Sequence, residues 1–340
     1  MTEKTRLTKT LAKEKTERPP VICPGGMMSA AVTEVLLGLT ENHFSQAGAM
    51  AQAAREVNRQ IGFENLGVPF DMTVEAEEFG AAVDLGDAGC EARVTAYNPL
   101  PLRDALKQWK SGNIASLRSK AVLDAIAQLK NDDVAVIGNV TGPVSIATSI
   151  YEPVDIFKLY RKDPELLRDF FAVINDYLID FSRRMIRAGA DVIAMCDPTS
   201  TGEILGAKNF KAFSVPLYRD FAAAMHQKGI PVILHICGSA GNIIKEMDQT
   251  GADALSFDSA VSISSAKREA KTPIMGNVST VLLSAGKPES IKTTTRYTLG
   301  SGVDILSPAC GIGMETRVEN LRALVDAGKT SEPIKREMKH

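Results

Sequence analysis

Long apolar runs are absent from this sequence of 340 residues. No uninterrupted stretch approaches the roughly 20 apolar residues that a membrane-spanning helix requires. The polar start, MTEKTRLTKTLAKEKTERPP, also lacks the apolar region of a secretion signal. We therefore expect a cytoplasmic protein that does not use a membrane.

The sequence has no excess of charge of either sign. It contains 39 Lys and Arg against 41 Asp and Glu, for a formal net charge of -2. This balance gives no general attraction to nucleic acid or to an anionic membrane, so any partner must be inferred from a particular site. Cysteine is scarce as well, and an odd number at irregular spacing favours reduced thiols over a disulfide framework; the five are Cys23, Cys90, Cys196, Cys237 and Cys310.

What the sequence does contain is a repeated alternation of short Val- and Ile-rich runs with longer segments of helical periodicity, which is typical of βα units. Eight parallel strands close a barrel, and the chain length suits an α/β fold of the (β/α)8, or TIM barrel, type. The predicted strands are 21–26, 65–72, 133–140, 190–197, 231–238, 253–259, 273–279 and 304–311. The predicted helices are 46–61, 114–130, 163–188, 208–228, 240–250, 288–299 and 314–327.

Two segments lie outside this repeat. Residues 1–18 are polar and are expected to form a surface helix or a loose arm, ahead of a single barrel domain over 19–340. Residues 80–98 alternate apolar and polar residues around an Asp-Ala-Gly turn, which predicts a β-hairpin inserted after the second strand. No short internal repeat is recognisable. Glycines that would end helices are Gly189, Gly229, Gly251, Gly300 and Gly328.

Polar residues gather where the predicted strands end, which is where barrel enzymes place their working groups. Residues two apart on a strand face the same side, so His235 and Cys237 can bind one metal ion together. Cys310 ends the eighth strand and Asp258 ends the sixth, next to the fifth. One imidazole, two thiolates and an oxygen ligand suit Zn²⁺, and three firm ligands with one replaceable position are typical of a catalytic site. The other polar residues at strand ends are candidates for substrate binding: Asp71, Asn139, Asp197 and Asn277.

Each of these residues also has a purely structural interpretation. A lone H-x-C in an apolar strand is more often a buried polar residue beside an inert cysteine, and it is the later Cys310 that favours a metal. Cys196 precedes Asp197, so only one of them can face the barrel centre, and we expect Asp197. The other three cysteines, Cys23, Cys90 and Cys196, are interpreted as packing or surface residues.

The remaining candidates carry weaker signals. His43 is interpreted as a loop or cap residue, His226 lies in the last turn of a helix, and His340 is the final residue. Asp71 precedes Glu75 and Glu77, which predicts either an acidic rim or a solvated helix start. The glycines of PGGMMS and CGIGME match no nucleotide-binding pattern, and no D-x-H-x-x-G segment is present to ligate cobalamin.

With these residues in place, the chain resembles the uroporphyrinogen decarboxylase superfamily and, within it, the methylcobamide:coenzyme M methyltransferases. The H-x-C with a distant Cys is its most specific carrier, because it separates zinc methyltransferases from porphyrinogen decarboxylases. The resemblance runs from about 19 to 329 and is carried by ERPPV (17–21), VPFDMTVEAEEFG (68–80), GNVTGPVSIA (138–147), CDPTSTGEIL (196–205), LHICGSAGN (234–242), MGNVST (275–280) and SPACGIGMETRVENLRALVDA (307–327).

The resemblance implies a zinc ion held by His235, Cys237 and Cys310, with Asp258 as the candidate for an acidic side chain that completes the substrate-free site. It implies that an acceptor thiol displaces this fourth ligand, becomes a thiolate and attacks the methyl group of a methylcobamide, releasing Co(I). The corrinoid would arrive on a separate small protein, in keeping with the missing cobalamin motif.

The chain departs from the family pattern in two places. After ERPPV it offers CPGGMMSAA, without the arginine that would hold a highly carboxylated porphyrinogen. No Arg or Lys stands at a strand end to pair with the sulfonate of coenzyme M. The leading hypothesis is thus zinc-dependent methyl transfer to a small thiol, with coenzyme M the first candidate and homocysteine an open alternative. The others are a metal-free tetrapyrrole decarboxylase that uses Asp71 and a non-catalytic subunit that binds the corrinoid protein.

Overall fold

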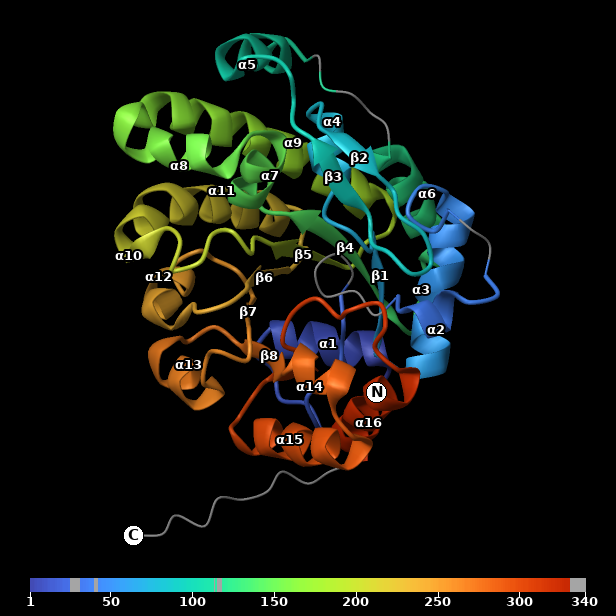
Figure 1. Ribbon diagram of the computed structural model, residues 1–340. Coiled ribbons are helices and arrows are strands. Elements are labelled where there is room, and N and C mark those ends of the chain that lie inside the picture. Colours follow the sequence, from blue (N-terminus) through green and yellow to red (C-terminus); the bar gives the residue numbers. More distant parts are fainter. Residues whose placement is uncertain (25–30, 40–41, 113, 115–117, 331–340) are drawn as a thin grey trace.

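The computed structural model describes residues 1–24, 31–39, 42–112, 114 and 118–330. Within them a parallel sheet of seven strands curls into a barrel with helices around its outside (Figure 1). The strands are, in their order across the sheet, β1 (Asn65–Val68), β4 (Ala135–Thr141), β5 (Val192–Cys196), β6 (Val232–Ile236), β7 (Ala254–Phe257), β8 (Ile274–Val278) and β9 (Ile305–Pro308).

The extended segment 20–23 closes the barrel between its first and last strands. Val21 forms a parallel bridge with Leu306 of β9, and its carbonyl accepts a hydrogen bond of 2.8 Å from Glu64, just before β1. The backbone of Cys23 is bonded in both directions to the side chain of Asn65, with both bonds at 2.8 Å. The (β/α)8 barrel is therefore confirmed, with the predicted strand 21–26 reduced to one bridge; residues 25 and 26 lie outside the described part of the chain.

The other seven predicted strands each overlap an observed one, and at β1 the difference lies wholly at the carboxyl end. This strand stops at Val68 instead of continuing to residue 72, because Pro69 has no N–H to donate to a neighbouring strand. The predicted hairpin insertion is confirmed as the antiparallel pair β2 (Ala82–Asp84) and β3 (Arg93–Ala96).

The helices that follow the barrel strands are more broken than the sequence indicates. The predicted helix 208–228 consists of α10 (Gly206–Asn209), a π-helical turn (Phe210–Ser214) and α11 (Val215–His226). Residues 240–250 form a 3-10 turn (Gly241–Ile243) and α12 (Ile244–Met247). The other long helices are α3 (Ala47–Ile61), α6 (Ser119–Leu129), α9 (Pro164–Ala188), α15 (Pro288–Gly300) and α16 (Val318–Thr330).

Several helices of one to three turns were not predicted. They are α2 (Thr33–Leu36), α4 (Val74–Glu78), α5 (Leu102–Lys110), α7 (Pro143–Ile150), α8 (Pro153–Lys162), α13 (Ile263–Glu269) and α14 (Thr280–Ala285). Among the described residues, no helix is both long enough and apolar enough to cross a membrane.

Three of the five predicted helix-ending glycines have the left-handed backbone that favours glycine: Gly189, Gly229 and Gly251. The prediction is wrong for Gly300, which is the last residue of α15, while Gly302 takes the positive φ of 88°. It is also wrong for Gly328, which lies inside α16. A Cβ there would be 2.5 Å from Leu306 Cδ2, so this glycine allows α16 to pack closely on β9.

The N-terminal segment contains α1 (Glu3–Leu11), which lies at the amino ends of the strands. Its Leu7 is fully buried, and Lys4 donates its backbone N–H to the carbonyl of Asp133 at 2.8 Å, just before β4. Lys4 also pairs with Asp191, just before β5, at 2.7 Å. The first helix thus packs against the end of the barrel opposite the carboxyl ends of the strands.

At the amino ends of the strands, the acidic residue before every second strand accepts a hydrogen bond from the backbone of the neighbouring strand. Asp191 accepts a hydrogen bond from the backbone N–H of Val136 at the start of β4, and Asp253 and Asp304 accept equivalent bonds from β6 and β8, at 2.7–2.9 Å. Glu64 does the same for Val21 at 2.8 Å. The tetrapeptides ADVI, ADAL and VDIL that carry the aspartates recur before β5, β7 and β9, a short repetition that the sequence analysis missed.

Candidate metal centre

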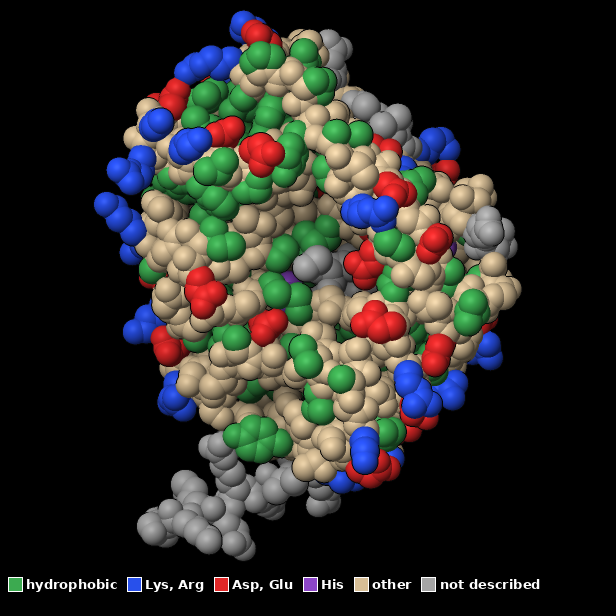
Figure 2. Space-filling model, viewed as in Figure 1, with side chains coloured by type: hydrophobic (Ala, Val, Ile, Leu, Met, Phe, Trp, Pro, Cys, Tyr) green, Lys and Arg blue, Asp and Glu red, His purple; other side chains and the backbone are tan. Residues whose placement is uncertain are grey.

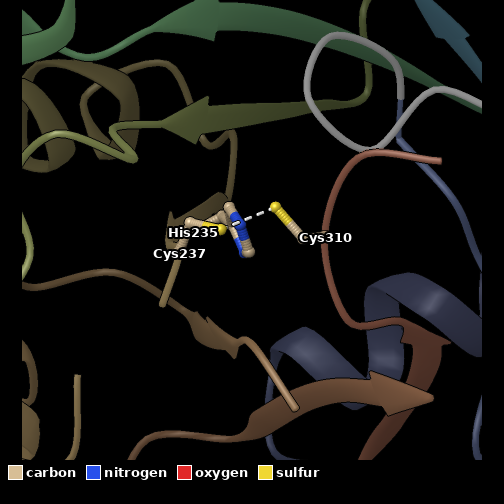
Figure 3. A group of neighbouring side chains, drawn as sticks. All are labelled: His235, Cys237 and Cys310. Atoms are coloured by element: carbon tan, nitrogen blue, oxygen red, sulfur yellow. Dashed lines mark hydrogen bonds between the residues drawn. The ribbon is translucent and has the colours of Figure 1, made fainter. Parts of the chain in front are cut away.

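Three metal-binding side chains meet at the carboxyl end of the barrel. His235 is in β6, Cys237 follows that strand, and Cys310 follows β9 (Figure 3). Their ligand atoms all lie within 4.8 Å of one another, and the two Sγ atoms are 2.8 Å apart. The face seen in Figure 2 is hollowed at its centre, with apolar and acidic side chains around the hollow. Cys237 and Cys310 are 73 residues apart in the chain, and the closure of the barrel brings them together.

His235 has one ring nitrogen with a partner and one without. The ring is 1% exposed, and its Nδ1 lies 3.0 Å from the Oγ of Ser256 in β7. Its Nε2 is buried and has no hydrogen-bond partner among the described residues. Buried polar atoms are rarely left without a partner, so an imidazole nitrogen of this kind beside two thiols fits a metal ligand.

The Cys310 thiol affects the ionisation of Cys237. The neighbouring Cys310 thiol and burial together raise the pKa of Cys237 far above its usual range. A bound divalent cation reverses this effect, because a coordinated thiol loses its proton. The donor set of one imidazole and two sulfurs therefore suits Zn²⁺ as a resident ion.

Asp258 lies next to the cluster because β7 runs in register with β6. Ile236 pairs with Phe257, which brings the following residues, Cys237 and Asp258, side by side; one carboxylate oxygen is 3.6 Å from the Cys237 Sγ. The other oxygen accepts the N–H of Ala260 at 2.9 Å. Asn277 donates its side-chain amide to the carbonyls of Asp258 and Val261, at 3.0 and 2.7 Å, and so holds this loop.

Asn139 lies deeper in the barrel. It is 2% exposed, and its amide donates to the carbonyl of Pro69 at 3.2 Å. Its side-chain carbonyl has no partner among the described residues. In the strand register it is two residues below the layer that contains Cys196 and His235, on the same face of the sheet.

The prediction that Asp197 rather than Cys196 faces the barrel centre is wrong. Cys196 pairs in register with His235, so the two side chains share the inner face. Asp197 turns outward, where its carboxylate accepts hydrogen bonds from the backbone N–H groups of Val144 and Ser145 at the start of α7 and from the Tyr218 hydroxyl. It is fully buried and caps that helix, and burial raises its pKa.

Asp71 forms neither an acidic rim nor a solvated helix start. It is 6% exposed and pairs with the buried Arg118 at 3.1 Å, while Arg118 also binds Glu77 at 2.6 Å. Glu75 is fully enclosed and accepts hydrogen bonds from the N–H and hydroxyl of Thr141; burial raises its pKa to about 7. The sequence reasoning missed Arg118, because nothing local marks a partner 47 residues away from Asp71.

The remaining histidines and cysteines lie away from the cluster. His226 ends α11, as predicted, and its Nε2 is 2.8 Å from Asp253. His43 is a buried loop residue, and Cys90 is exposed on the hairpin. Cys23 is buried. His340 and residues 25–29 of PGGMMS lie outside the described residues.

Known proteins are similar to this chain over nearly its full length. The model of the family "Uroporphyrinogen decarboxylase (URO-D)" matches residues 2–331. The methylcobamide:CoM methyltransferase MtbA of Methanosarcina mazei is 32% identical over 336 residues, which is 96% of this chain and 98% of that protein. MtaA of Methanosarcina barkeri, also a methylcobamide:CoM methyltransferase, is 28% identical over 96% of this chain and 97% of its own.

A solved structure described as a methyltransferase from Methanosarcina mazei superposes with a TM-score of 0.86 at 27% identity, covering 97% of this chain and 98% of that one. The likeness therefore extends over nearly the whole barrel. The chain belongs to the uroporphyrinogen decarboxylase family, and within that family it is similar to the methylcobamide:CoM methyltransferases.

Proposed function

We propose that the protein is a zinc-dependent methyltransferase that moves a methyl group from a methylated corrinoid to a small thiol, with coenzyme M the first candidate. The methyltransferase class rests on relatives that match this chain over nearly its full length. The corrinoid would be carried by a separate small protein. The single observation that carries the zinc dependence is the buried, unpartnered Nε2 of His235 beside the thiols of Cys237 and Cys310.

Zinc held by these three residues would stabilise the thiolate form of a substrate sulfur, the nucleophilic form, at neutral pH. The chain's own residues would set the geometry for this. His235 lies in β6 and Cys237 directly follows it, and Cys310 follows β9, three strands further along the sheet. Because the ligands lie on the ends of buried strands, the site is held rigidly.

Asp258 is the residue we propose as the replaceable fourth ligand. Its carboxylate is already beside Cys237 at 3.6 Å, and one of its oxygens is free of the backbone bond that the other makes to Ala260. Asn277 supports the loop that carries it. A side chain on a supported loop can leave a site and return without moving the barrel.

Among the four candidates for substrate binding, Asn139 has an unused acceptor, since its side-chain carbonyl has no partner among the described residues. Asp71 and Asp197 are both committed to protein contacts, with Arg118 and with α7. We assign them supporting roles. A decarboxylase that relies on Asp71 would have to break the Arg118 pair first, which makes that alternative less favourable.

The proposal is tested with purified protein, methylcobalamin and a panel of thiols that includes coenzyme M and homocysteine. We expect stoichiometric zinc and demethylation of the corrinoid, followed by absorbance. Cys237→Ala and Cys310→Ala should each lose zinc and activity, whereas Cys90→Ala, which removes an exposed thiol on the hairpin, should keep both.

Three outcomes would contradict the proposal. The first is activity retained in both Cys237→Ala and Cys310→Ala. The second is CO₂ released from uroporphyrinogen by zinc-free protein, which would favour the decarboxylase. The third is tight binding of a corrinoid protein without turnover of any thiol, which would favour a non-catalytic subunit.

A further inference from the structure

Strand β7 and the residue after it place one side chain beside each of the two candidate ligands at the end of β6. His235 pairs in register with Ser256, and Cys237 is next to Asp258 two residues later. The tripeptide Ser-Phe-Asp (256–258) therefore lies alongside His-Ile-Cys (235–237). The two residues of each contact, His235 with Ser256 and Cys237 with Asp258, are 21 positions apart in the chain. Asp258 already has a proposed role as a ligand, which leaves Ser256 to be explained.

Ser256 contacts the ring of His235 at its Nδ1 atom. Its Oγ is 3.0 Å from Nδ1, and both residues are buried, at 0% and 1% exposure. A neutral histidine has one N–H and one acceptor nitrogen, and the hydrogen bond made by one nitrogen sets which of them carries the proton. A hydroxyl oxygen can accept from Nδ1–H, which leaves the lone pair on Nε2, the buried nitrogen without a hydrogen-bond partner among the described residues.

We propose that Ser256 is a positioning residue that fixes the tautomer and the ring orientation of His235 for metal binding. The proposal rests on the proposed zinc site. In the opposite tautomer, a donor N–H would be buried at Nε2, where no hydrogen-bond partner lies among the described residues. Ser256 itself does not touch the metal, and it acts only through His235.

The contact is particular to this position rather than a general property of buried serines in the barrel. Ser307, which is also fully buried, donates its hydroxyl to the adjacent carbonyl of Pro308. The hydroxyl of Ser182 in α9 is buried without a hydrogen-bond partner among the described residues. Ser182 therefore offers a matched control, a buried serine hydroxyl remote from the site.

The first test measures the zinc dissociation constant by competition with a chelator. Loss of a hydrogen-bond partner behind a metal-binding histidine typically weakens metal affinity by about 10- to 100-fold, and we expect that loss for Ser256→Ala. Ser182→Ala should bind zinc as the unmodified protein does. Unchanged affinity in Ser256→Ala would overturn the proposal.

A pair of variants separates the hydroxyl from the shape of the side chain. Ser256→Thr and Ser256→Val add the same volume, but only threonine keeps the oxygen. Affinity should recover in Ser256→Thr relative to Ser256→Val. Equal zinc affinity in the two would also overturn the proposal, even if Ser256→Ala fails to fold.

The tautomer can be read directly by NMR with ¹⁵N-labelled histidine, because the chain has only 4 histidines. Zinc-free protein should show His235 with its proton on Nδ1, and Ser256→Ala should show a mixture of tautomers or exchange. A purely structural serine would not change this signal, so an unchanged tautomer in Ser256→Ala would count against positioning.

These readouts also separate this inference from the proposed function. Zinc affinity that depends on Ser256, in a protein that methylates no thiol, would refute only the proposed reaction. Methyl transfer with zinc affinity independent of Ser256 would refute only the positioning role.

Discussion

Replacing Glu64 by glutamine tests how the seam of the barrel is held. The Glu64 side chain is 1% exposed and accepts hydrogen bonds from Arg6, Arg18 and the backbone N–H of Val21. Its own N–H donates to the Val21 carbonyl, so this residue connects the segment 20–23 to the start of β1. Glutamine keeps the shape and can still accept from Val21, but it has no charge to offset two arginines.

We expect Glu64→Gln to lower the free energy of unfolding by about 3 kcal/mol, the lower end of the roughly 3–5 kcal/mol that breaking a buried ion pair costs. The lower end applies for two reasons. Arg6 keeps a second partner, Glu17, at 2.6 Å, and the Arg18 side chain is 22% exposed and can reach water.

Urea unfolding followed by circular dichroism measures this difference. Asp104→Asn serves as the control, because Asp104 pairs with Lys107 on the surface of α5 with side chains 56% and 78% exposed. Exposed pairs of this kind contribute about 0.3–0.5 kcal/mol. A Glu64→Gln effect no larger than that of Asp104→Asn, at unchanged m value, would refute the reasoning.

The pH dependence gives a second check on the same residue. Burial raises the pKa of Glu64, but the hydrogen bonds from Arg18 and Val21 outweigh it, so the folded pKa lies below the usual 4.5. A depressed folded pKa gives stability that is present above the unfolded pKa and is lost as the pH falls through the folded value. The difference between the two proteins should therefore be full at neutral pH and shrink on acidification below 4.5.

Two further predictions concern stability. Gly328→Ala should destabilise the protein by about 1 kcal/mol, because overpacking costs roughly 1–3 kcal/mol and better helix propensity returns up to about 1. Gly48→Ala, in α3 with nothing within 4 Å of the added Cβ, should cost nothing; equal urea midpoint shifts in both would contradict this. Burial raises the pKa of Glu75 to about 7, so the folded state binds this proton more tightly than the unfolded state does. The unmodified protein should therefore lose stability as the pH rises from 4.5 to about 7, and Glu75→Gln should remove that loss. Thermal midpoints across this range test it, and parallel curves for both proteins would rule it out.

The sequence was sufficient for the barrel and for the placement of the candidate ligands, because both depend on local periodicity. Alternation on β6 places His235 and Cys237 on one face, and the carboxyl ends of all strands of a barrel meet at one mouth. Cys310 could therefore be placed beside them without knowing any contact. Ser256 could also have been predicted as the neighbour of His235, since aligning S-F-D with H-I-C requires only the register of adjacent strands.

What could not be predicted depends on contacts between segments distant in sequence. Asp197 turns outward because the start of α7 supplies N–H donors for it, and α7 was itself not predicted. Asp71 is buried because Arg118 neutralises it, and the chain between them gives no sign of this pairing. The predicted strand 21–26 forms only one bridge, because the side chains of Glu64 and Asn65 accept the backbone hydrogen bonds of Val21 and Cys23.

The acidic residues before alternate strands have a consequence for how this barrel can change. They fasten the strands at the amino ends, through Glu64, Asp191, Asp253 and Asp304, far from the carboxyl ends where His235 and Cys237 lie. The side-chain hydrogen bonds that join the strands and the candidate metal-binding residues thus lie at opposite ends of the barrel. A loop at the carboxyl end can be exchanged, by evolution or by grafting, without breaking the hydrogen bonds that keep the barrel closed.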